Sequence, residues 1–392
     1  MFEQALLAMA SVATDPYLLF LIFATTILGV IIGVLPGLGA TTGAALLLPF
    51  TLTMDPVHAI AVLATIYVSA TFAGSITAIL INTPGTSAAA ATTFDGYPLA
   101  QKGEAGRALG VAVISSTVGG VFSVIVLCFA APLLARVAYE FRSPEYFALT
   151  VFGLSMLASI SAGGAVKNLI GGIFGVWLST IGAERVTGIE RFMFGNYELY
   201  EGLHFVPIFI GLFAISELLV QSKTVNKIVN TVSMKAVKLP TKEDYKKIWK
   251  TILRSCGIGT FIGVLPAEGA TVASMIGYSE ARRWSKNKEE FGKGSIEGIA
   301  GAEAANNSAT GGAMVPTMVL GIPGSGTTAI ILVGLMVHGL RPGVYLFTEQ
   351  VEKVYQIFGS MFFANIMFML MGLYAAKIFA RAVSYTHLTL PT

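Results

Sequence analysis

Long apolar segments separated by very few charges restrict this chain more than any other feature. They recur from residue 17 to residue 380. A bilayer core about 30 Å thick requires about 20 apolar residues of helix, and only helices and closed barrels satisfy their backbone hydrogen bonds there. The segments are far longer than barrel strands. Composition agrees, since 54% of residues are hydrophobic and only 12% charged, too few to cover a soluble protein. We therefore expect an all-α polytopic membrane protein.

The apolar segments predict individual helices. The candidates are 17–35, 40–54, 57–81, 108–135, 146–162, 165–183, 205–220, 251–265, 269–279, 296–320, 327–338 and 354–380. Three of them, 251–265, 269–279 and 327–338, are too short to cross alone and are expected to be half-helices or parts of hairpins. Residues 1–14 lack the basic start of a signal peptide and predict a short interfacial helix.

Basic residues are unevenly distributed. None precedes Lys102, nine of the 25 lie between Lys223 and Arg254, and five lie between Arg282 and Lys293. They flank apolar segments without interleaved aromatic residues, which indicates cytoplasmic loops rather than a nucleic-acid surface. The two cysteines lie in apolar runs and the four histidines are scattered. We therefore predict no disulfide, no redox motif and no metal site built from these residues.

A nine-residue motif occurs twice. GVLPGLGAT at 33–41 returns as GVLPAEGAT at 263–271, with seven identical positions. A Pro-Gly motif follows each copy, NTPGTS at 82–87 and GIPGSGTT at 321–328. The shared order predicts an internal duplication, with a first transmembrane repeat at 15–220, a basic cytoplasmic linker at 221–250 and a second repeat at 251–381.

The flanking charges predict that the two repeats have opposite orientations. The first motif lies between Asp15 and Asp55, with no basic residue nearby, and the second lies between Lys250 and Arg282. Five crossings from an outer position at Asp55 lead to the basic cytoplasmic loop and place residues 184–201 outside. This is the pattern of an inverted-topology repeat.

Proline and glycine at the four motifs predict broken helices. A break frees backbone groups, and where it lines a cavity these groups can bind solutes. Helix N-termini suit a carboxylate, and C-terminal carbonyls suit a cation. Neutral N–H, hydroxyl and amide groups form the predicted substrate site: Asn82, Thr83, Gly85, Thr86, Ser87, Asn306, Asn307, Gly324, Ser325, Thr327 and Thr328. The predicted cation-coupling site comprises Pro36, Gly37, Gly39, Pro266, Glu268, Gly269 and Glu303. The alternative is that the small residues only permit close helix packing.

Four polar residues interrupt the apolar segment 296–320. Glu303, Asn306, Asn307 and Thr310 share one face at helical spacing. A carboxylate at membrane depth is costly, which favours a role as proton carrier or cation ligand. The alternative is hydrogen bonding between helices, with Glu303 still wet at the cytoplasmic mouth.

Enzymatic functions are disfavoured. The glycine-rich stretch 324–329 resembles a dinucleotide fingerprint but has no βαβ context, and no GxxxxGK[ST] motif is present. An intramembrane protease would need a serine nucleophile with a paired histidine, and neither is found. We therefore expect no catalytic residues and no cofactor, only a transported Na⁺ or H⁺.

Four segments together resemble the large membrane subunit of bacterial tripartite tricarboxylate transporters, the TctA family. They are GVLPGLGATTGAALLLPFT, NTPGTSAAAATTFDGYPLAQKGEAGRALG, GVLPAEGAT and EGIAGAEAANNSATGGAMVPTMVLGIPGSGTTAIILVGLMVHGLRPG. The resemblance runs from about residue 14 to 381. It implies an inner-membrane secondary transporter that imports carboxylates on a sodium or proton gradient. It also implies a small membrane subunit, a periplasmic solute-binding protein, and further apolar spans after residue 381. The second repeat is therefore expected to be truncated, with residues 382–392 as an atypical tail.

Two other functions remain open at this point. One is a passive anion or small-solute channel with paired re-entrant loops. The other is a non-transporting membrane scaffold, for example a receptor for a periplasmic protein.

Overall fold

A computed structural model describes residues 2–159, 164–184, 187–216, 219–220, 239–266 and 269–386. The N-terminal helices are α1 (Phe2–Thr14), α2 (Pro16–Val34), α3 (Ala40–Thr51), α4 (Pro56–Ile81), η1 (Ser87–Thr92), α5 (Thr93–Leu99), η2 (Ala100–Glu104), α6 (Ala105–Tyr139), α7 (Ser143–Ser159) and α8 (Ala165–Ser179). Strand β1 (Gly182–Ala183) pairs antiparallel with β2 (Glu190–Arg191), followed by η3 (Tyr197–Leu199), α9 (Phe205–Phe209) and η4 (Ile210–Ile215).

The C-terminal part is also helical. Its elements are α11 (Lys242–Val264), α12 (Gly269–Trp284), η5 (Lys288–Glu290), α13 (Ile296–Leu320), α14 (Gly326–Val337), α15 (Val344–Glu349) and α16 (Val351–Thr386). Four of the described helical stretches are long and apolar enough to cross a membrane: Pro16–Val34, Pro56–Ile81, Ser87–Tyr139 and Val351–Tyr374. The prediction of an all-α polytopic membrane protein is confirmed.

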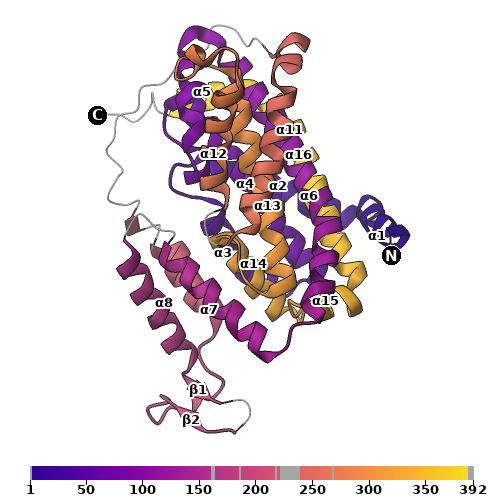
Figure 1. Ribbon diagram of the computed structural model, residues 1–392, viewed down its shortest axis with the longest axis vertical. Coiled ribbons are helices and arrows are strands. Elements are labelled where there is room, and N and C mark those ends of the chain that lie inside the picture. Colours follow the sequence, from indigo (N-terminus) through magenta and orange to yellow (C-terminus); the bar gives the residue numbers. More distant parts are fainter. Residues whose placement is uncertain are drawn as a thin grey trace.

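Helices α4 and α13 form the centre of the molecule (Figure 1). Nearly every residue of both is buried. Helices α2, α3 and α16 pack against α4, whereas α6, α11 and α12 pack against α13. Both helices are rich in alanine and glycine, which lets neighbouring helices pack closely on every side.

Glycines allow these helices to cross closely. A Cβ atom on Gly33 of α2 would lie 2.4 Å from the carbonyl oxygen of Ala70 on α4, and one on Gly263 of α11 would lie 2.4 Å from that of Ala309 on α13. Gly33 and Gly263 each begin one copy of the repeated motif. Small residues at both crossings bring the backbones into contact, as is usual between membrane helices.

Capping side chains set where several helices begin. Asp15 and Asp55 precede Pro16 and Pro56 and accept hydrogen bonds from the first free N–H groups of α2 and α4. Thr241 and its partner Asp244 form a capping box at the start of α11.

The predicted half-helix at 251–265 was wrong at its start, because α11 begins at Lys242. The polar residues from Lys242 onward extend α11 to 23 residues.

Other boundaries differ by a few residues. The segment predicted at 165–183 ends as α8 at Ser179, and its last residues belong to β1. The segment 205–220 begins as α9 and continues into the wider turns of η4. Helix α1 confirms a helix at 2–14 and packs against α16. Residues 221–238 of the expected linker lie outside the described residues.

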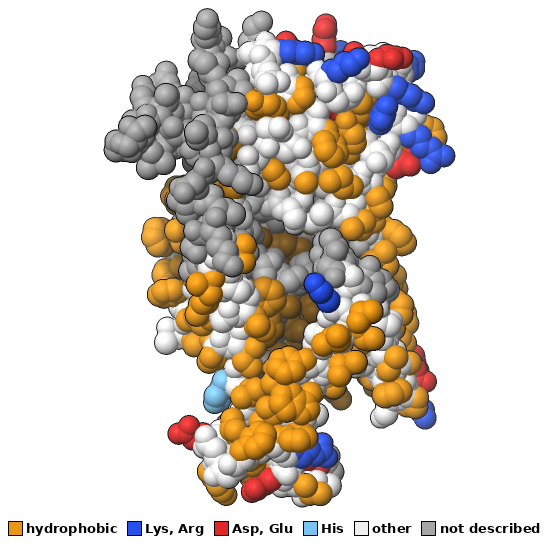
Figure 2. All heavy atoms as spheres, turned by 90° about the vertical axis from the view of Figure 1, so that its left-hand side faces the viewer, with side chains coloured by type: hydrophobic (Ala, Val, Ile, Leu, Met, Phe, Trp, Pro, Cys, Tyr) orange, Lys and Arg blue, Asp and Glu red, His pale blue; other side chains and the backbone are white. Residues whose placement is uncertain are grey.

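Charged side chains gather at the ends of the molecule, with a hydrophobic band between them (Figure 2). The end that carries α5 and the start of α11 holds many Lys and Arg residues, and the β1–β2 hairpin lies at the opposite end (Figures 1 and 2). By the positive-inside rule, the end rich in Lys and Arg is the one expected to face the cytoplasm.

Candidate functional site

One cavity of about 170 Å³ is surrounded by the starts of four helical segments. Helices α3, η1, α12 and α14 each contribute their first residues or N-cap, and α4 adds two polar side chains. The lining residues are Gly39, Ala40, Thr41, Tyr67, Thr71, Thr86, Ser87, Ala88, Gly269, Ala270, Thr271, Ser325, Gly326 and Thr327. All four segments follow a break that was predicted from the sequence.

Two pairs of hydroxyl groups join the halves of the chain at this cavity. The Oγ1 atoms of Thr41 and Thr327 are 2.9 Å apart, and the Oγ of Ser87 is 3.0 Å from the Oγ1 of Thr271. Thr41 and Thr271 are the last residues of the two motif copies. The last threonine of each motif copy therefore contacts the segment that follows the Pro-Gly break of the other half.

The breaks after α4 and α13 share one backbone geometry. Asn82 has φ 54° and Gly321 has φ 68°, and their N–H groups donate to the carbonyl oxygens of Thr77 and Pro316. This left-handed conformation ends a helix and suits Gly and Asn best. Asn82 is exposed and does not line the cavity. Its place in the predicted substrate site is thus not supported, because its backbone conformation already explains the residue.

In each half, the Pro-Gly break that follows the central helix lies against the break within the repeated motif. The N–H of Gly37 donates to the carbonyl oxygen of Gly85 at 3.3 Å, and a Cβ on Gly85 would lie 2.0 Å from the oxygen of Gly33. In the other half, a Cβ on Gly324 would lie 3.0 Å from the oxygen of Gly263. Gly85 and Gly324 therefore position the breaks without lining the cavity themselves.

The electrostatic character of the cavity comes from backbone groups. Its described lining contains no Lys or Arg. The Ser325 and Thr328 side chains form a capping box at the start of α14, which leaves the N–H groups of Gly326 and Thr327 without an acceptor inside the helix. Helix N-termini carry about half a positive charge each. Four such starts around one cavity suit a small anion.

Glu303 lies apart from the cavity and is fully buried. It accepts hydrogen bonds from the hydroxyl groups of Thr92 on η1 and Ser116 on α6, the latter at 2.7 Å. The alternative of hydrogen bonding between helices agrees with these two contacts, but its expectation of a wet carboxylate was wrong, because the side chain is fully buried. The side-chain amides of Asn306 and Asn307 are also fully buried and have no hydrogen-bond partner in the described part of the chain.

Of the predicted cation-coupling residues, only some of those that the structure describes lie together. Gly39 and Gly269 line the 170 Å³ cavity, while Pro36 and Gly37 are exposed. Pro266 lines a separate cavity of about 250 Å³ beside α7. Glu268 lies outside the described residues.

The remaining predicted substrate residues divide into two groups. Thr86, Ser87, Ser325 and Thr327 line the cavity. Thr83 lies outside it, with its hydroxyl bonded to the carbonyl oxygen of Ile81. Thr41 and Thr271 were not predicted, although the repeated motif contains both, and no sequence signal marks Tyr67 and Thr71.

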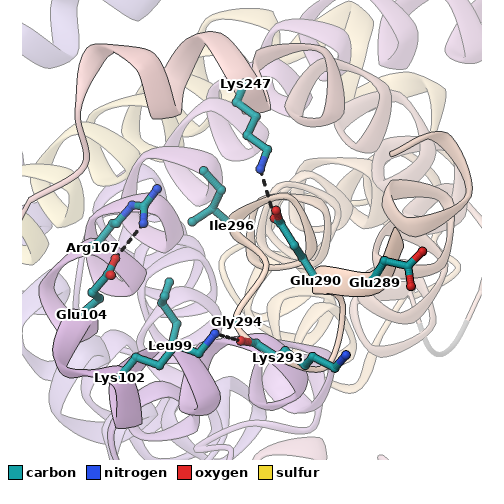
Figure 3. A pocket seen from close by; sticks show the side chains of 10 residues that line it. All are labelled: Leu99, Lys102, Glu104, Arg107, Lys247, Glu289, Glu290, Lys293, Gly294 and Ile296. Atoms are coloured by element: carbon teal, nitrogen blue, oxygen red, sulfur yellow. Dashed lines mark hydrogen bonds and ion pairs between the residues drawn. The ribbon is translucent and has the colours of Figure 1, made fainter. Parts of the chain in front are cut away.

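A second cavity, of about 420 Å³, lies where α6, α11 and the loop before α13 meet (Figure 3). Its charged residues largely pair with one another. Lys247 contacts Glu290 at 3.1 Å, and Arg107 contacts Glu104 at 2.7 Å. Arg107 also binds Asp244 of α11 through two nitrogen atoms, at 2.5 and 3.0 Å. Of these contacts, the one between Arg107 and Asp244 joins α6 of the first half to α11 at the basic end of the molecule.

Asp95 ties α5 to the same loop. Its Oδ1 accepts three backbone hydrogen bonds of 2.8 Å, from Gly292, Gly294 and Ser295, and the side chain is fully buried. A buried carboxylate of this kind is stabilised by N–H donors directed at it. It fixes the start of α13 against the segment that follows η1.

Comparison with known proteins places the chain in a family. Residues 19–390 match the Tripartite tricarboxylate transporter TctA family, so the match extends beyond residue 381, where the resemblance was expected to end. An "Uncharacterized 52.8 kDa protein in TAR-I ttuC' 3'region" of Agrobacterium vitis is 40% identical over 353 residues, covering 90% of this chain and 70% of that protein. An "Uncharacterized protein in TAR-II ttuC' 3'region" of the same organism is 38% identical over 115 residues, covering 29% of this chain and 48% of that protein. No solved structure matches. The chain therefore belongs to the tripartite tricarboxylate transporter TctA family.

Proposed function

We propose that this chain is the large membrane subunit of a secondary transporter that imports a small, tricarboxylate-like carboxylate together with a cation across a bacterial inner membrane. A periplasmic solute-binding protein would deliver the substrate, and a small membrane subunit would complete the complex. Family membership supports the transport role. The chain itself would not be an enzyme, because the family to which it belongs is one of transporters.

The convergence of four helix starts on one cavity carries this proposal. Hydroxyl and N–H groups there can donate to a carboxylate without the strong fixed charge of a lysine or arginine. Neutral dipoles hold an anion firmly enough to bind it, yet allow it to leave on the other side. The co-transported cation would then offset the charge of the substrate.

The paired geometry of the two halves supports alternating access. Thr41 and Thr327 meet where α3 and α14 begin, and Ser87 and Thr271 meet where η1 and α12 begin. We infer that the halves, 15–220 and 251–381, are inverted repeats that rock against each other around the cavity. Each hydroxyl pair is a single weak contact, so that either can separate at small cost.

Protection of an introduced cysteine tests the binding site. Cys128 and Cys256 are first replaced by Ala, and Ser87→Cys is then labelled with a thiol reagent in the reconstituted three-subunit complex. Citrate and related carboxylates are expected to slow labelling, since Ser87 is exposed and lines the cavity. Ser155→Cys on the exposed side of α7 is the matched control and should show no protection.

Uptake by the same vesicles tests the function. Accumulation of the carboxylate should require an inward sodium or proton gradient. Equal labelling of Ser87→Cys with and without every carboxylate tried, or currents that reverse at the solute potential without any cation gradient, would contradict the proposal. The second result would instead identify a passive channel.

A further inference from the structure

Glu303 combines complete burial with two neutral hydrogen-bond partners. Its side chain is 0% exposed. One carboxyl oxygen accepts from Thr92 and the other from Ser116. No Lys, Arg or His nitrogen among the described residues lies within ion-pair distance of it. A carboxylate ion taken out of water without a counter-charge costs many kcal/mol, whereas the protonated acid costs far less.

Titratable groups on the elements packed around α13 are engaged elsewhere. Asp95 on α5 binds backbone N–H groups, Arg107 on α6 binds Glu104 and Asp244, and the hydroxyl of Tyr67 on α4 accepts from Ser325. Cys256 on α11 is a buried thiol, and Tyr278 on α12 packs against two aromatic rings. On α13 itself, Glu297 accepts a hydrogen bond from Ser285. In the described part of the chain, none of these groups forms an ion pair or a hydrogen bond with Glu303.

We propose that the coupling ion is a proton and that Glu303 carries it. The inference rests on the transport function proposed above and selects between its two possible cations. In the conformation described here, the carboxyl is protonated. Facing outward, the carboxylate takes a proton from hydronium, which forms an O–H bond and leaves a water molecule. Facing inward, that bond breaks and the proton passes to cytoplasmic water, so that one proton moves with each turn of the cycle.

Helix η1 links the proton to the substrate. Ser87 at its start lines the substrate cavity, and Thr92 at its end donates to Glu303. These residues are about 10 Å apart along a helix that rises about 2 Å per residue. Loss of the proton would leave a buried negative charge, so η1 and α6 must separate from α13 to admit water. Any such movement of η1 also changes the substrate cavity, which makes transport of the two species interdependent.

Glu303→Gln has a side chain that is neutral at every pH, and it therefore distinguishes proton coupling from movement of the substrate. In the reconstituted complex this variant should exchange labelled carboxylate between equal pools on the two sides, yet fail to accumulate it on a pH gradient. A pH dye inside the vesicles should report acidification with substrate entry in the wild type and none in the variant. Glu297→Gln, the matched carboxyl-to-amide change on the same helix, should leave accumulation, exchange and acidification at wild-type levels.

Several results would overturn the assignment. Gradient-driven accumulation by Glu303→Gln at the wild-type level is one, and loss of both exchange and accumulation in a correctly folded variant is another. Wild-type uptake that follows sodium without luminal acidification would overturn it too, and this measurement needs no variant. A wild-type complex that neither accumulates nor exchanges any carboxylate would instead refute the proposed transport function.

Discussion

Single residues at the helix breaks act mainly through backbone conformation. Asn82 was predicted to bind substrate through its amide, yet the equivalent residue of the other half, Gly321, has no side chain and the same left-handed geometry. Asn is the residue that replaces Gly most readily there. Hydroxyl residues behave differently, because Thr41 and Thr327 direct their side chains at each other across the cavity.

The N-cap of α2 gives a pH-dependent prediction at this scale. The Leu18 N–H, with His58 and the Tyr17 N–H, holds the pKa of Asp15 below its ordinary value of 3.8, against a raising effect of burial. A lowered pKa means that the cap stabilises the fold above pH 3.8 and that this contribution disappears as pH falls through the folded pKa. Asp15→Ala should lower stability by ~1 kcal/mol at neutral pH and by progressively less below pH 3.8.

Thermal unfolding in detergent from pH 3 to pH 7 measures this difference. Asp15→Asn is the control, because its amide oxygen can cap the helix and does not titrate. Its stability relative to Asp15→Ala should therefore be independent of pH. If the wild type were more stable than Asp15→Ala by the same amount at pH 3 as at pH 7, the carboxylate would not be the group that caps the helix.

At the scale of elements, glycine contacts determine how closely helices cross. Gly33→Ala and Gly263→Ala would each place a Cβ 2.4 Å from a backbone carbonyl oxygen of the neighbouring central helix. Because backbone cannot move aside as a side chain does, each change should cost ~1–3 kcal/mol or more and reduce the yield of folded protein.

Gly171→Ala on α8 is the matched control, since nothing lies within 4 Å of its added Cβ. Fluorescence-detected size-exclusion profiles before and after heating compare the three variants. Profiles of Gly33→Ala or Gly263→Ala that match the wild type would mean that the α2–α4 or α11–α13 contact is looser than described.

Helix boundaries were predictable where hydropathy changes sharply. Segment 296–320 coincides with α13, because charged residues precede it and a Pro-Gly break follows. The start of α11 was missed, since a polar amphipathic turn extends the helix beyond its apolar part and only the Thr241–Asp244 capping box marks its beginning. Hydropathy reports which residues prefer lipid. A helix can continue through polar residues as long as its backbone hydrogen bonds and its N-cap are satisfied, so hydropathy does not mark where it begins.

At the scale of the whole molecule, the charge distribution predicts orientation. Lys and Arg gather at one end, where the α12–α13 loop lies, and the β1–β2 hairpin lies at the other (Figures 1 and 2). By the positive-inside rule, a membrane-impermeant thiol reagent added outside should label Thr187→Cys and not Lys288→Cys. Both residues are exposed, so accessibility within the protein does not bias the comparison.

Inverted membrane preparations provide the reciprocal measurement and should label Lys288→Cys only. Labelling of both positions from the same side would contradict the parity of crossings on which the inverted orientation rests. Native Cys128 and Cys256 are replaced by Ala in both variants, as in the protection experiment.

The sequence alone determined the membrane class, most helix positions and the places where helices break, because each depends on a local property: transfer of apolar residues to lipid, or interruption of a helix by Pro and Gly. Tertiary structure decided which residues meet. The hydroxyl pairs at the cavity join residues 286 and 184 positions apart, and the same packing takes Glu303 away from the cavity and encloses it. Such contacts depend on how closely and at what angle helices cross, and helical periodicity carries no information about that.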